Sequence, residues 1–362
     1  MDTETKKRDA QVEAAISHWA PRFVANGVPL TDFQEVTAGL EHWADWCAAW
    51  SARAAIHEEL GNRAFADNCK LSAGEHWTRA ALCYHFGKFL FVNDLAQMKA
   101  AHRKVVECRN KALPWLRPPG ERVAIPYEGK QLFGILRKPT GMRNAAIVVM
   151  CMGLDSTKEE MDDYENRFLR RGLATLAFDG PGQGEAEEDF PITPEYEKPV
   201  GAVIDYLESR DDIDVGRIGI WGVSFGGYYA PRAAAFDKRI KACVALSGAF
   251  ERSASFEGRP KLNAEAFRVR SKSATMEEAG KVALRVSLKG IAKNITCPIY
   301  IVAGTNDRLT PVSAAERLAA EVSGPCVLSI IEGGNHVVNN LWYRYRDQTA
   351  DWMATQLNAA TK

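Results

Sequence analysis

The sequence predicts an α/β protein with a mostly parallel, doubly wound sheet, preceded by a helical region. Residues 1–117 show helical periodicity with few prolines or glycines to interrupt it. From residue 145 onward, short apolar runs alternate with helical segments, which is typical of βαβ units whose strands run parallel. A third observation is a Gly-x-Ser-x-Gly pattern at residues 222–226, where one of these strands gives way to a helix.

The helical region is rich in aromatic residues. Its helical periodicity covers residues 9–19, 32–59, 63–93 and 95–112. Trp43, Trp46 and Trp50 follow one another at the spacing of a single helix face. Trp77 and Tyr84 add further rings. These side chains either fill the core of a helical subdomain or line a pocket for a flat ligand, and Trp77 and Tyr84 are our candidates for substrate binding.

A proline-rich break at residues 117–120 separates the helical region from the α/β part. Residues 121–127 and 131–137 alternate as in a β-hairpin. Apolar runs that suit buried parallel strands follow at residues 145–150, 173–178, 218–221, 242–246, 298–302 and 327–331. Between the runs at residues 242–246 and 298–302, helix-prone residues interrupt this alternation, and we interpret them as a helical lid inserted over the sheet. The expected parts are a helical N-terminal region for lid or dimer contacts, a first core part, the lid insertion and a second core part: residues 1–117, 118–250, 251–295 and 296–362.

Composition and charge narrow the classes of function. Lysine plus arginine and aspartate plus glutamate both number 46, so the net charge is zero, and no nucleic acid or anionic membrane surface is expected as a partner. No apolar run reaches the ~18 residues needed to span a bilayer. The charged residues 1–9 lack the apolar stretch of a secretory signal, so we expect a cytoplasmic protein. The eight cysteines form no CxxC pair, and we expect them to be reduced and mostly buried, with no metal and no cofactor bound.

The Gly-x-Ser-x-Gly pattern points to a nucleophile. Residues 218–221 are predicted as a strand and residues 228–235 as a helix, so Ser224 lies in the strand–turn–helix context of a nucleophile elbow. Gly222 and Gly226 would let the strand and the helix approach closely around the turn. The alternative is a glycine-rich turn whose serine only caps the helix, but the downstream partners of the serine favour the catalytic interpretation.

A serine hydroxyl needs a base, usually a histidine that a carboxylate orients. His336 is the only one of seven histidines in the α/β part, and it follows a predicted strand, where a doubly wound sheet places its ligand groups. Asp307 also follows a strand and is our candidate for the acid, although it could be a simple turn residue or helix cap. The rival, Asp179, precedes the serine, whereas the chain order in this class is serine, acid, histidine. The sequence therefore predicts a triad of Ser224, Asp307 and His336.

Acyl transfer also needs N–H donors for a developing oxyanion. We expect one from the backbone of Phe225, directly after the serine, and one from Gly153 or Leu154 in the loop after the strand at residues 145–150. The Asp-Gly-Pro-Gly-Gln-Gly loop at residues 179–184 could be mistaken for a phosphate cradle. It lacks the Lys-Ser/Thr of a P-loop and the glycine spacing of a dinucleotide site, so we interpret it as a turn that shapes the floor of a pocket.

Three segments carry a resemblance to a known family. They are Met-Gly-Leu-Asp-Ser-Thr-Lys-Glu-Glu at residues 152–160, Asp-Gly-Pro-Gly-Gln-Gly-Glu at residues 179–185 and Gly-Val-Ser-Phe-Gly-Gly at residues 222–227. With these segments the chain resembles the α/β-hydrolase superfamily, in the branch of the 2,6-dihydroxypseudooxynicotine hydrolases and FrsA-like esterases. The resemblance covers nearly the whole chain, because that branch also carries an N-terminal helical region. It implies the same triad, a small-molecule substrate bound between the core and the helical parts, and a homodimer.

The branch includes hydrolases that cleave a carbon–carbon bond between a dihydroxypyridine ring and an acyl carbon. The departing carbanion must be stabilised, so the ring is expected to react as its keto tautomer, equivalent to a β-diketone. The resemblance thus implies a serine hydrolase for a small aromatic or polyketide-like acyl compound, with carbon–carbon cleavage favoured. The branch's extra acid has no clear counterpart in residues 247–257, where Glu251 is our candidate for substrate binding. A carboxylesterase, thioesterase or amidase with the same triad is the alternative; a non-catalytic receptor and a prolyl-oligopeptidase-type peptidase are less favoured.

Overall fold

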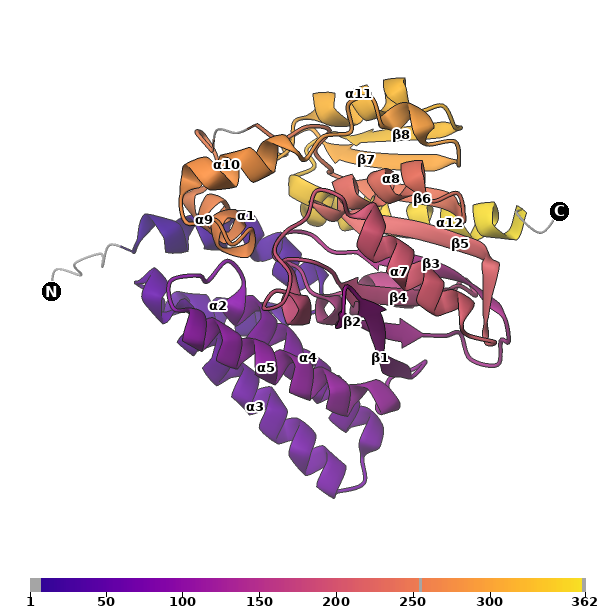
Figure 1. Ribbon diagram of the computed structural model, residues 1–362. Coiled ribbons are helices and arrows are strands. Elements are labelled where there is room, and N and C mark those ends of the chain that lie inside the picture. Colours follow the sequence, from indigo (N-terminus) through magenta and orange to yellow (C-terminus); the bar gives the residue numbers. More distant parts are fainter. Residues whose placement is uncertain (1–7, 254–255, 360–362) are drawn as a thin grey trace, which may run out of the picture. The chain divides into compact units, whose positions relative to one another are not determined.

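The computed structural model describes residues 8–253 and 256–359 (Figure 1). It divides the chain into two compact units. Unit 1 consists of Met1–Arg117 and Pro260–Ala266, and unit 2 of Pro118–Arg259 and Phe267–Lys362. The first division falls within the proline-rich break seen in the sequence. Most of the charged N-terminal segment, and two residues of the expected lid, lie outside the described residues.

Unit 1 is built from helices. They are α1 (Ala10–Ala25), α2 (Leu30–Ala38), α3 (Trp46–Ala66), α4 (Lys70–Lys88) and α5 (Leu95–Ala112), with 3₁₀ turns η1 (Trp43–Asp45) and η2 (Leu113–Trp115). Aromatic rings fill the centre of this unit: Phe23 stacks on Phe86 with centroids 3.8 Å apart, and Trp46 and Trp50 are fully buried. The aromatic residues of this region therefore contribute large apolar areas to its core.

The prediction of one long helix in this unit is wrong. The segment at residues 32–59 is two helices, because α2 ends before Gly39 and α3 begins only at Trp46. Trp43 therefore lies in η1 and not on the face of α3, although its ring stacks on that of Trp46 at 4.9 Å. Asp9 fixes the intervening turn by accepting a hydrogen bond from the backbone N–H of Trp43 at 2.9 Å. This long-range contact and the weak helix propensity of glycine outweigh the local periodicity.

Unit 2 contains an eight-stranded sheet in the order β1-β2-β4-β3-β5-β6-β7-β8. The strands are β1 (Gly120–Tyr127), β2 (Lys130–Arg137), β3 (Ala145–Cys151), β4 (Ala174–Asp179), β5 (Ile213–Val223), β6 (Ile240–Leu246), β7 (Ile299–Gly304) and β8 (Cys326–Ile331). The pairs β1–β2 and β2–β4 are antiparallel, and all other neighbours are parallel. Every residue of β3 and β4 is buried, which explains the uninterrupted apolar sequence of β3 and the mostly apolar sequence of β4.

Helices cover both faces of this sheet. The helices of unit 2 are α6 (Asp162–Leu169), α7 (Glu197–Glu208), α8 (Gly226–Phe236), α10 (Met276–Leu284), α11 (Val312–Glu321) and α12 (Arg346–Ala359), while α9 (Lys261–Arg270) belongs partly to each unit. Within unit 2, α7 and α8 lie in front of the sheet and α12 lies behind it (Figure 1). The segment expected to be a lid contains α9 and α10, and its role as a lid stays a prediction.

The strand order marks one place in the sheet as special. From β3 the chain passes to β4 on one side, whereas β5 lies on the other side, so the winding of the chain reverses between β3 and β5. Open α/β sheets bind ligands outside the carboxyl ends of their strands at such a switch point. Cys151, the last residue of β3, pairs with Gly222 near the end of β5. The segments that follow these two strands therefore start side by side.

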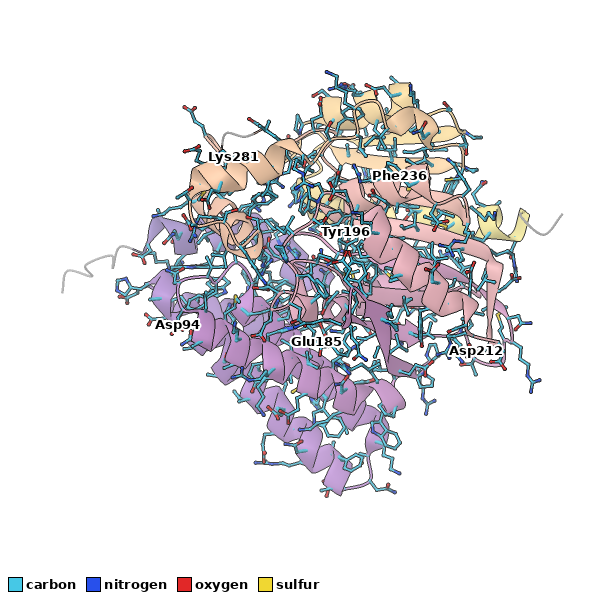
Figure 2. The ribbon with its side chains drawn as sticks, in the orientation of Figure 1. Asp94, Glu185, Tyr196, Asp212, Phe236 and Lys281 are labelled. Atoms are coloured by element: carbon cyan, nitrogen blue, oxygen red, sulfur yellow. The ribbon has the colours of Figure 1, made fainter. Side chains whose placement is uncertain are left out.

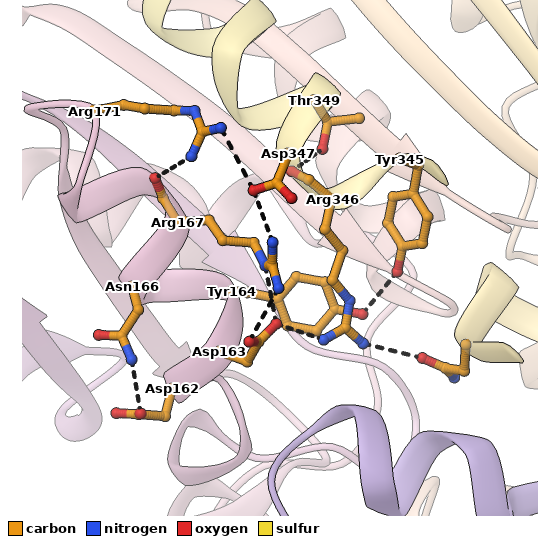
Figure 3. Close-up of polar contacts among 11 residues, drawn as sticks. Asp162, Asp163, Tyr164, Asn166, Arg167, Arg171, Tyr345, Arg346, Asp347 and Thr349 are labelled. Carbon is orange, nitrogen blue, oxygen red and sulfur yellow. Dashed lines mark hydrogen bonds and ion pairs between the residues drawn. The ribbon is translucent and has the colours of Figure 1, made fainter. Parts of the chain in front are cut away.

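A polar network joins α6 to the C-terminal part of the chain (Figure 3). Arg346 Nη1 lies 2.7 Å from Asp163 Oδ2, and its guanidinium carbon lies 3.9 Å from the ring centroid of Tyr164. Arg346 Nη2 also donates to Asn339 Oδ1 at 3.3 Å, and the amide of Asn339 donates to the carbonyl oxygen of His336 at 3.3 Å. The network therefore supports the loop that carries His336.

None of the described helices is long and apolar enough to cross a lipid bilayer. All eight cysteines lie in the described part of the chain and are free thiols. Five of them are buried: Cys47, Cys83, Cys108, Cys151 and Cys243.

Candidate active site

Ser224 occupies a strained turn between β5 and α8. Its φ is 58°, in the left-handed region that residues with a Cβ rarely adopt. A Cβ at Gly222 would lie 1.9 Å from the carbonyl oxygen of Gly226, and one at Gly226 would lie 2.0 Å from that of Cys151, so both positions require glycine. The backbone N–H of Ser224 donates to Leu246 at 2.8 Å. Close packing thus holds the serine in the geometry of a nucleophile elbow.

The three residues predicted as a triad lie in one chain of hydrogen bonds. Ser224 Oγ is 2.7 Å from His336 Nε2. His336 Nδ1 is 2.8 Å from Asp307 Oδ2 and 3.0 Å from Asp307 Oδ1. The side chains of His336 and Asp307 are only 4% and 1% exposed. This arrangement can pass the serine proton to the histidine while the aspartate stabilises the resulting imidazolium.

Asp307 is held as a carboxylate. Burial alone would raise its pKa, but the neighbouring His336 and hydrogen bonds from the backbone N–H groups of Thr310 and Leu309 outweigh that effect. The pKa of Asp307 is therefore lowered. Both backbone groups donate to the same oxygen, Oδ1, at 3.0 and 2.8 Å, which leaves Oδ2 as the close partner of the imidazole.

The loop that carries His336 is strained as well. Val337 and Val338, both β-branched, have φ values of 61° and 53°. Such a backbone costs free energy and persists only where the surroundings hold it. Here Ser247, just after β6, accepts a hydrogen bond from the backbone N–H of Val337 at 3.0 Å. The two strained residues directly follow His336, and the hydrogen bond to Ser247 helps to hold the loop that carries the imidazole.

Backbone N–H groups lie where an oxyanion hole is expected. Gly153 is close to the serine: a Cβ built on it would lie 3.2 Å from Cβ of Ser224. Phe225 caps the N-terminus of α8, which adds the positive end of the helix dipole. Among the described residues, the backbone N–H groups of Gly153, Leu154 and Phe225 have no hydrogen-bond acceptor. No such acceptor would compete with a developing negative charge, and the role of these groups as an oxyanion hole stays a prediction.

Gln183, which the sequence did not single out, organises this loop. Its Nε2 donates to the carbonyl oxygens of Met152 and Gly153, both at 2.8 Å. Its Oε1 accepts a hydrogen bond from Tyr196 Oη at 2.7 Å, and Tyr196 lies in the interior of unit 2 (Figure 2). By holding two carbonyls on one side, Gln183 fixes the plane of the peptide groups whose N–H groups face the other side. The loop at residues 179–184 thus holds the segment that is expected to supply an oxyanion donor, which is a more specific role than the expected floor of a pocket.

The rival acid, Asp179, is engaged elsewhere. Lys158 Nζ lies 2.7 Å from Asp179 Oδ2, 2.6 Å from Glu159 Oε1 and 2.8 Å from Glu185 Oε2. The three carboxylates could in principle hold a metal ion, but the ammonium group already lies among them. Burial would lower the pKa of Lys158, yet the three negative charges outweigh this and raise it, so the lysine stays charged.

A second possible metal group lies in unit 1. Asp32, His57 and Cys83 have donor atoms within 4.8 Å of one another. The sequence showed no such cluster, because these residues are far apart in the chain. Arg53 already pairs with Asp32 at 3.1 Å, and burial raises the pKa of the Cys83 thiol, so the sulfur stays protonated. In both groups a basic side chain thus already pairs with an acid that a metal ion would need.

The three candidates for substrate binding are not linked to the serine in the described part of the chain. Glu251 is exposed, forms an ion pair with Arg317 and accepts a hydrogen bond from Ser287 Oγ at 3.1 Å. Trp77 and Tyr84 are buried in unit 1, where their polar atoms bond to Asn62 at 3.1 Å and Glu58 at 3.0 Å. Their contact with a substrate stays a prediction.

The nucleophile elbow at a switch point of a mostly parallel sheet, followed in the chain by an aspartate and a histidine that reach the serine, defines an enzyme of the α/β-hydrolase fold. The predicted fold class is confirmed. The family model of the FrsA-like esterases matches residues 32–358. The chain therefore belongs to the FrsA-like esterase family.

Individual relatives agree with this assignment. The chain is 34% identical to 2,6-dihydropseudooxynicotine hydrolase of Paenarthrobacter nicotinovorans over 359 residues, 97% of this chain and 94% of the relative. The crystal structure of the 2,6-dihydroxy-pseudo-oxynicotine hydrolase matches with a TM-score of 0.87, covering 94% of this chain and 96% of that one. The α/β-hydrolase XenA of Xenoacremonium sinensis is 32% identical over 219 residues, 57% of this chain and 51% of the relative. AbyA5, at 18% identity and a TM-score of 0.68, covers 96% of this chain and 98% of its own, and shows the shared fold.

Proposed function

We propose that this protein is a serine hydrolase that cleaves a carbon–carbon bond in a small aromatic or polyketide-like acyl compound of the β-diketone type. The observation that carries the hydrolase chemistry is the contact chain from Ser224 Oγ through His336 to Asp307, with 2.7 and 2.8 Å between successive partners. The choice of bond rests on the resemblance to the 2,6-dihydroxypseudooxynicotine hydrolases, which extends over nearly the whole chain including its helical N-terminal region.

The geometry supports the following course of reaction. His336 Nε2 takes the proton of Ser224 as the serine oxygen attacks the ketone carbon, and the N–H groups of Phe225 and of Gly153 or Leu154 bind the oxygen that becomes negative. When the tetrahedral intermediate collapses, the carbon–carbon bond breaks and its electron pair moves into the enolate of the departing fragment. The imidazolium of His336 then protonates that fragment, and water releases the acyl group from the serine. In a variant of this course, His336 directs hydroxide at the same carbon and no acyl-enzyme forms.

The alternative is a carboxylesterase, thioesterase or amidase that uses the same residues. The description of the matched family, an esterase, favours it. The triad serves both reactions, because the choice of bond depends on what stabilises the departing group and delivers its proton.

Turnover of two substrate sets tests the proposal. One set contains short-chain aryl esters, and the other contains aryl β-diketones and acylated dihydroxy-heteroaromatic compounds. We expect the wild type to cleave the second set and Ser224→Ala to lose this activity, while Ser209→Ala, a change of an exposed serine, retains it. Rapid ester hydrolysis with inert diketones would overturn the carbon–carbon assignment and support the alternative.

We also propose a homodimer that forms through the N-terminal helices. The resemblance to the family supports it, and α3 carries the exposed apolar side chains of Ile56 and Phe65. Light scattering is expected to give twice the mass of the 362-residue chain. A monomeric mass across the concentration range would contradict this proposal.

A further inference from the structure

Arg252 is a buried cation that forms no ion pair with the residues that the structure describes. Arg252 comes shortly after β6 in the chain and is 9% exposed. Its Nε and Nη2 atoms are buried and have no hydrogen-bond acceptor among the described residues. Buried arginines are normally paired with carboxylates or fully hydrogen-bonded, because a desolvated charge without partners is costly. An exception of this kind calls for an explanation.

Aromatic rings hold the guanidinium of Arg252 in place. Its central carbon lies 5.1 Å from the ring centroid of Phe225 and 4.5 Å from that of Phe267. Ring faces attract a cation but do not accept the in-plane N–H bonds of a guanidinium at carboxylate strength. The rings therefore orient Arg252 and leave its donors available. Phe225 directly follows Ser224 in the chain, so Arg252 packs on the side chain of the residue next to the expected nucleophile.

The charges near Arg252 do not neutralise it. Burial lowers its pKa, and the like charge of Arg259 lowers it further, while the negative charge of Asp155 opposes this effect more weakly. Asp155 is itself engaged by another arginine, because its Oδ1 accepts a hydrogen bond from Arg270 Nη1 at 2.9 Å. Guanidinium groups nevertheless stay protonated in proteins. Arg252 is thus a permanent positive charge that an incoming anion would stabilise.

Tyr229 supplies a second unused donor beside Phe225. Its hydroxyl is buried with no hydrogen-bond partner among the described residues. Its ring stacks on Tyr196 at 3.5 Å and lies 4.5 Å from the ring of Phe225. Burial raises the pKa of Tyr229 well above its usual value, so the hydroxyl stays neutral and able to donate. Two independent side chains therefore have unpaired donors around one residue of the expected oxyanion hole.

We propose that Arg252 and the hydroxyl of Tyr229 bind a delocalised oxyanion of the substrate, either the enolate oxygen of a keto–enol compound or a carboxylate. This inference rests on the proposed function and specifies its substrate class as an acyl compound that is, or becomes, anionic. A planar guanidinium matches the two oxygens of a carboxylate or of a β-diketonate, and the phenol hydroxyl adds a third donor.

The same contact would assist carbon–carbon cleavage. When the bond breaks, its electron pair moves into the enolate of the departing fragment, and the negative charge comes to lie on oxygen. A cation fixed in a dry environment stabilises that charge without having to reorganise. Arg252 keeps its own proton throughout, since His336 returns the proton that it took from Ser224. An ester with a good leaving group needs no such help at the departing fragment.

Equilibrium binding in the Ser224→Ala background tests this inference without requiring turnover. Calorimetry would compare two anions with matched neutral compounds: 2,6-dihydroxypyridine with 2,6-dimethoxypyridine for the enolate source, and benzoate with benzamide for the carboxylate source. We expect at least one anion to bind more tightly than its neutral counterpart. Adding Arg252→Met is expected to weaken the binding of that anion by about tenfold to a hundredfold, as for the loss of a charged hydrogen-bond partner. The affinity for the neutral compound should stay unchanged.

Two further variants keep the test decisive if Arg252→Met does not fold. Tyr229→Phe removes only an unpartnered hydroxyl, so the protein should remain folded while the anion binds several-fold more weakly. Arg252→Lys keeps the charge but loses the planar pair of donors, and we expect intermediate affinity. Arg317→Met is the matched control, because Arg317 also lies over a ring, that of Phe250 at 4.1 Å, but is 41% exposed and paired with Glu251.

The inference is overturned if neither anion is preferred over its neutral counterpart, or if Arg252 and Tyr229 variants bind the preferred anion as tightly as the parent. The outcomes distinguish failure of the proposed carbon–carbon cleavage from failure of the proposed anion site. Binding of an anion that depends on Arg252, together with inert diketones in the wild type, would reject carbon–carbon cleavage and retain the anion site. Cleavage of diketones that is indifferent to Arg252 and Tyr229 would retain the proposed function and reject this site.

Discussion

Replacing Asp307 by asparagine tests the orientation of the imidazole with almost no change of shape. Oδ1 of Asp307 accepts two backbone N–H bonds, from Leu309 at 2.8 Å and Thr310 at 3.0 Å. In Asp307→Asn the amide oxygen is expected to take that place, because an NH₂ group cannot accept either bond. The NH₂ group would then occupy the position of Oδ2, which lies 2.8 Å from His336 Nδ1.

The consequence for the proton relay follows from this exchange. An NH₂ donor at that distance makes Nδ1 of His336 an acceptor, so the ring proton moves to Nε2, which faces Ser224 Oγ at 2.7 Å. A protonated Nε2 cannot take the serine proton. We expect kcat to fall by about 10⁴-fold, or roughly 5.5 kcal/mol of transition-state stabilisation, the scale known for this change in serine proteases.

The assay is steady-state turnover of the best substrate from either set, with the thermal midpoint and circular dichroism recorded beside it. Asp347→Asn, a change in the partly exposed network between α6 and α12, is the matched control and should retain turnover within a few-fold. A folded Asp307→Asn protein with kcat within tenfold of the wild type would refute the assigned role of Asp307.

Three further predictions concern the site and its support. Gly222→Ala should prevent correct folding, measured by yield and thermal midpoint, because its Cβ would lie 1.9 Å from the carbonyl oxygen of Gly226; a normal midpoint would contradict the strained turn. Gln183→Leu should lower kcat by about tenfold or more with a smaller change in KM, since one oxyanion donor contributes on the order of a hundredfold and Gln183 acts through the loop; unchanged kcat would contradict this. The lowered pKa of Asp307 means that its carboxylate stabilises the fold above the unfolded pKa of about 3.9 and that this contribution is lost as pH falls through the lower folded value. The midpoint difference between wild type and Asp307→Asn should therefore shrink as the pH falls below about 4.

The contact between Ser224, His336 and Asp307 could be expected from the sequence because each of these residues carries a local signal. Ser224 lies between two glycines, and His336 and Asp307 each follow an apolar run that can be recognised as a strand. The parallel sheet then brings the ends of such strands to one edge, so a correct prediction of strands also places the loops. Chain order alone separated Asp307 from Asp179, and the structure shows Asp179 in a buried cluster with Lys158.

The supporting residues carry no comparable signal. Gln183 matters because its amide spans from Tyr196 to the expected oxyanion segment. Arg252 stands out only because its buried Nε and Nη2 atoms have no hydrogen-bond acceptor in the described part of the chain. Both properties depend on contacts between segments far apart in the chain, which periodicity and motif spacing do not report. For the same reason the break between α2 and α3 was missed, since the turn at Trp43 depends on Asp9.

Labelling with a fluorophosphonate tests the central claim most directly. The reagent reacts with serines that a histidine activates, and mass spectrometry of the digested protein locates the adduct. We predict a single phosphonylated site at Ser224 in the wild type and none in His336→Ala, since the imidazole lies 2.7 Å from the serine oxygen. A folded wild-type protein that is not labelled, or labelling of Ser224 that persists at the same rate in His336→Ala, would contradict the account.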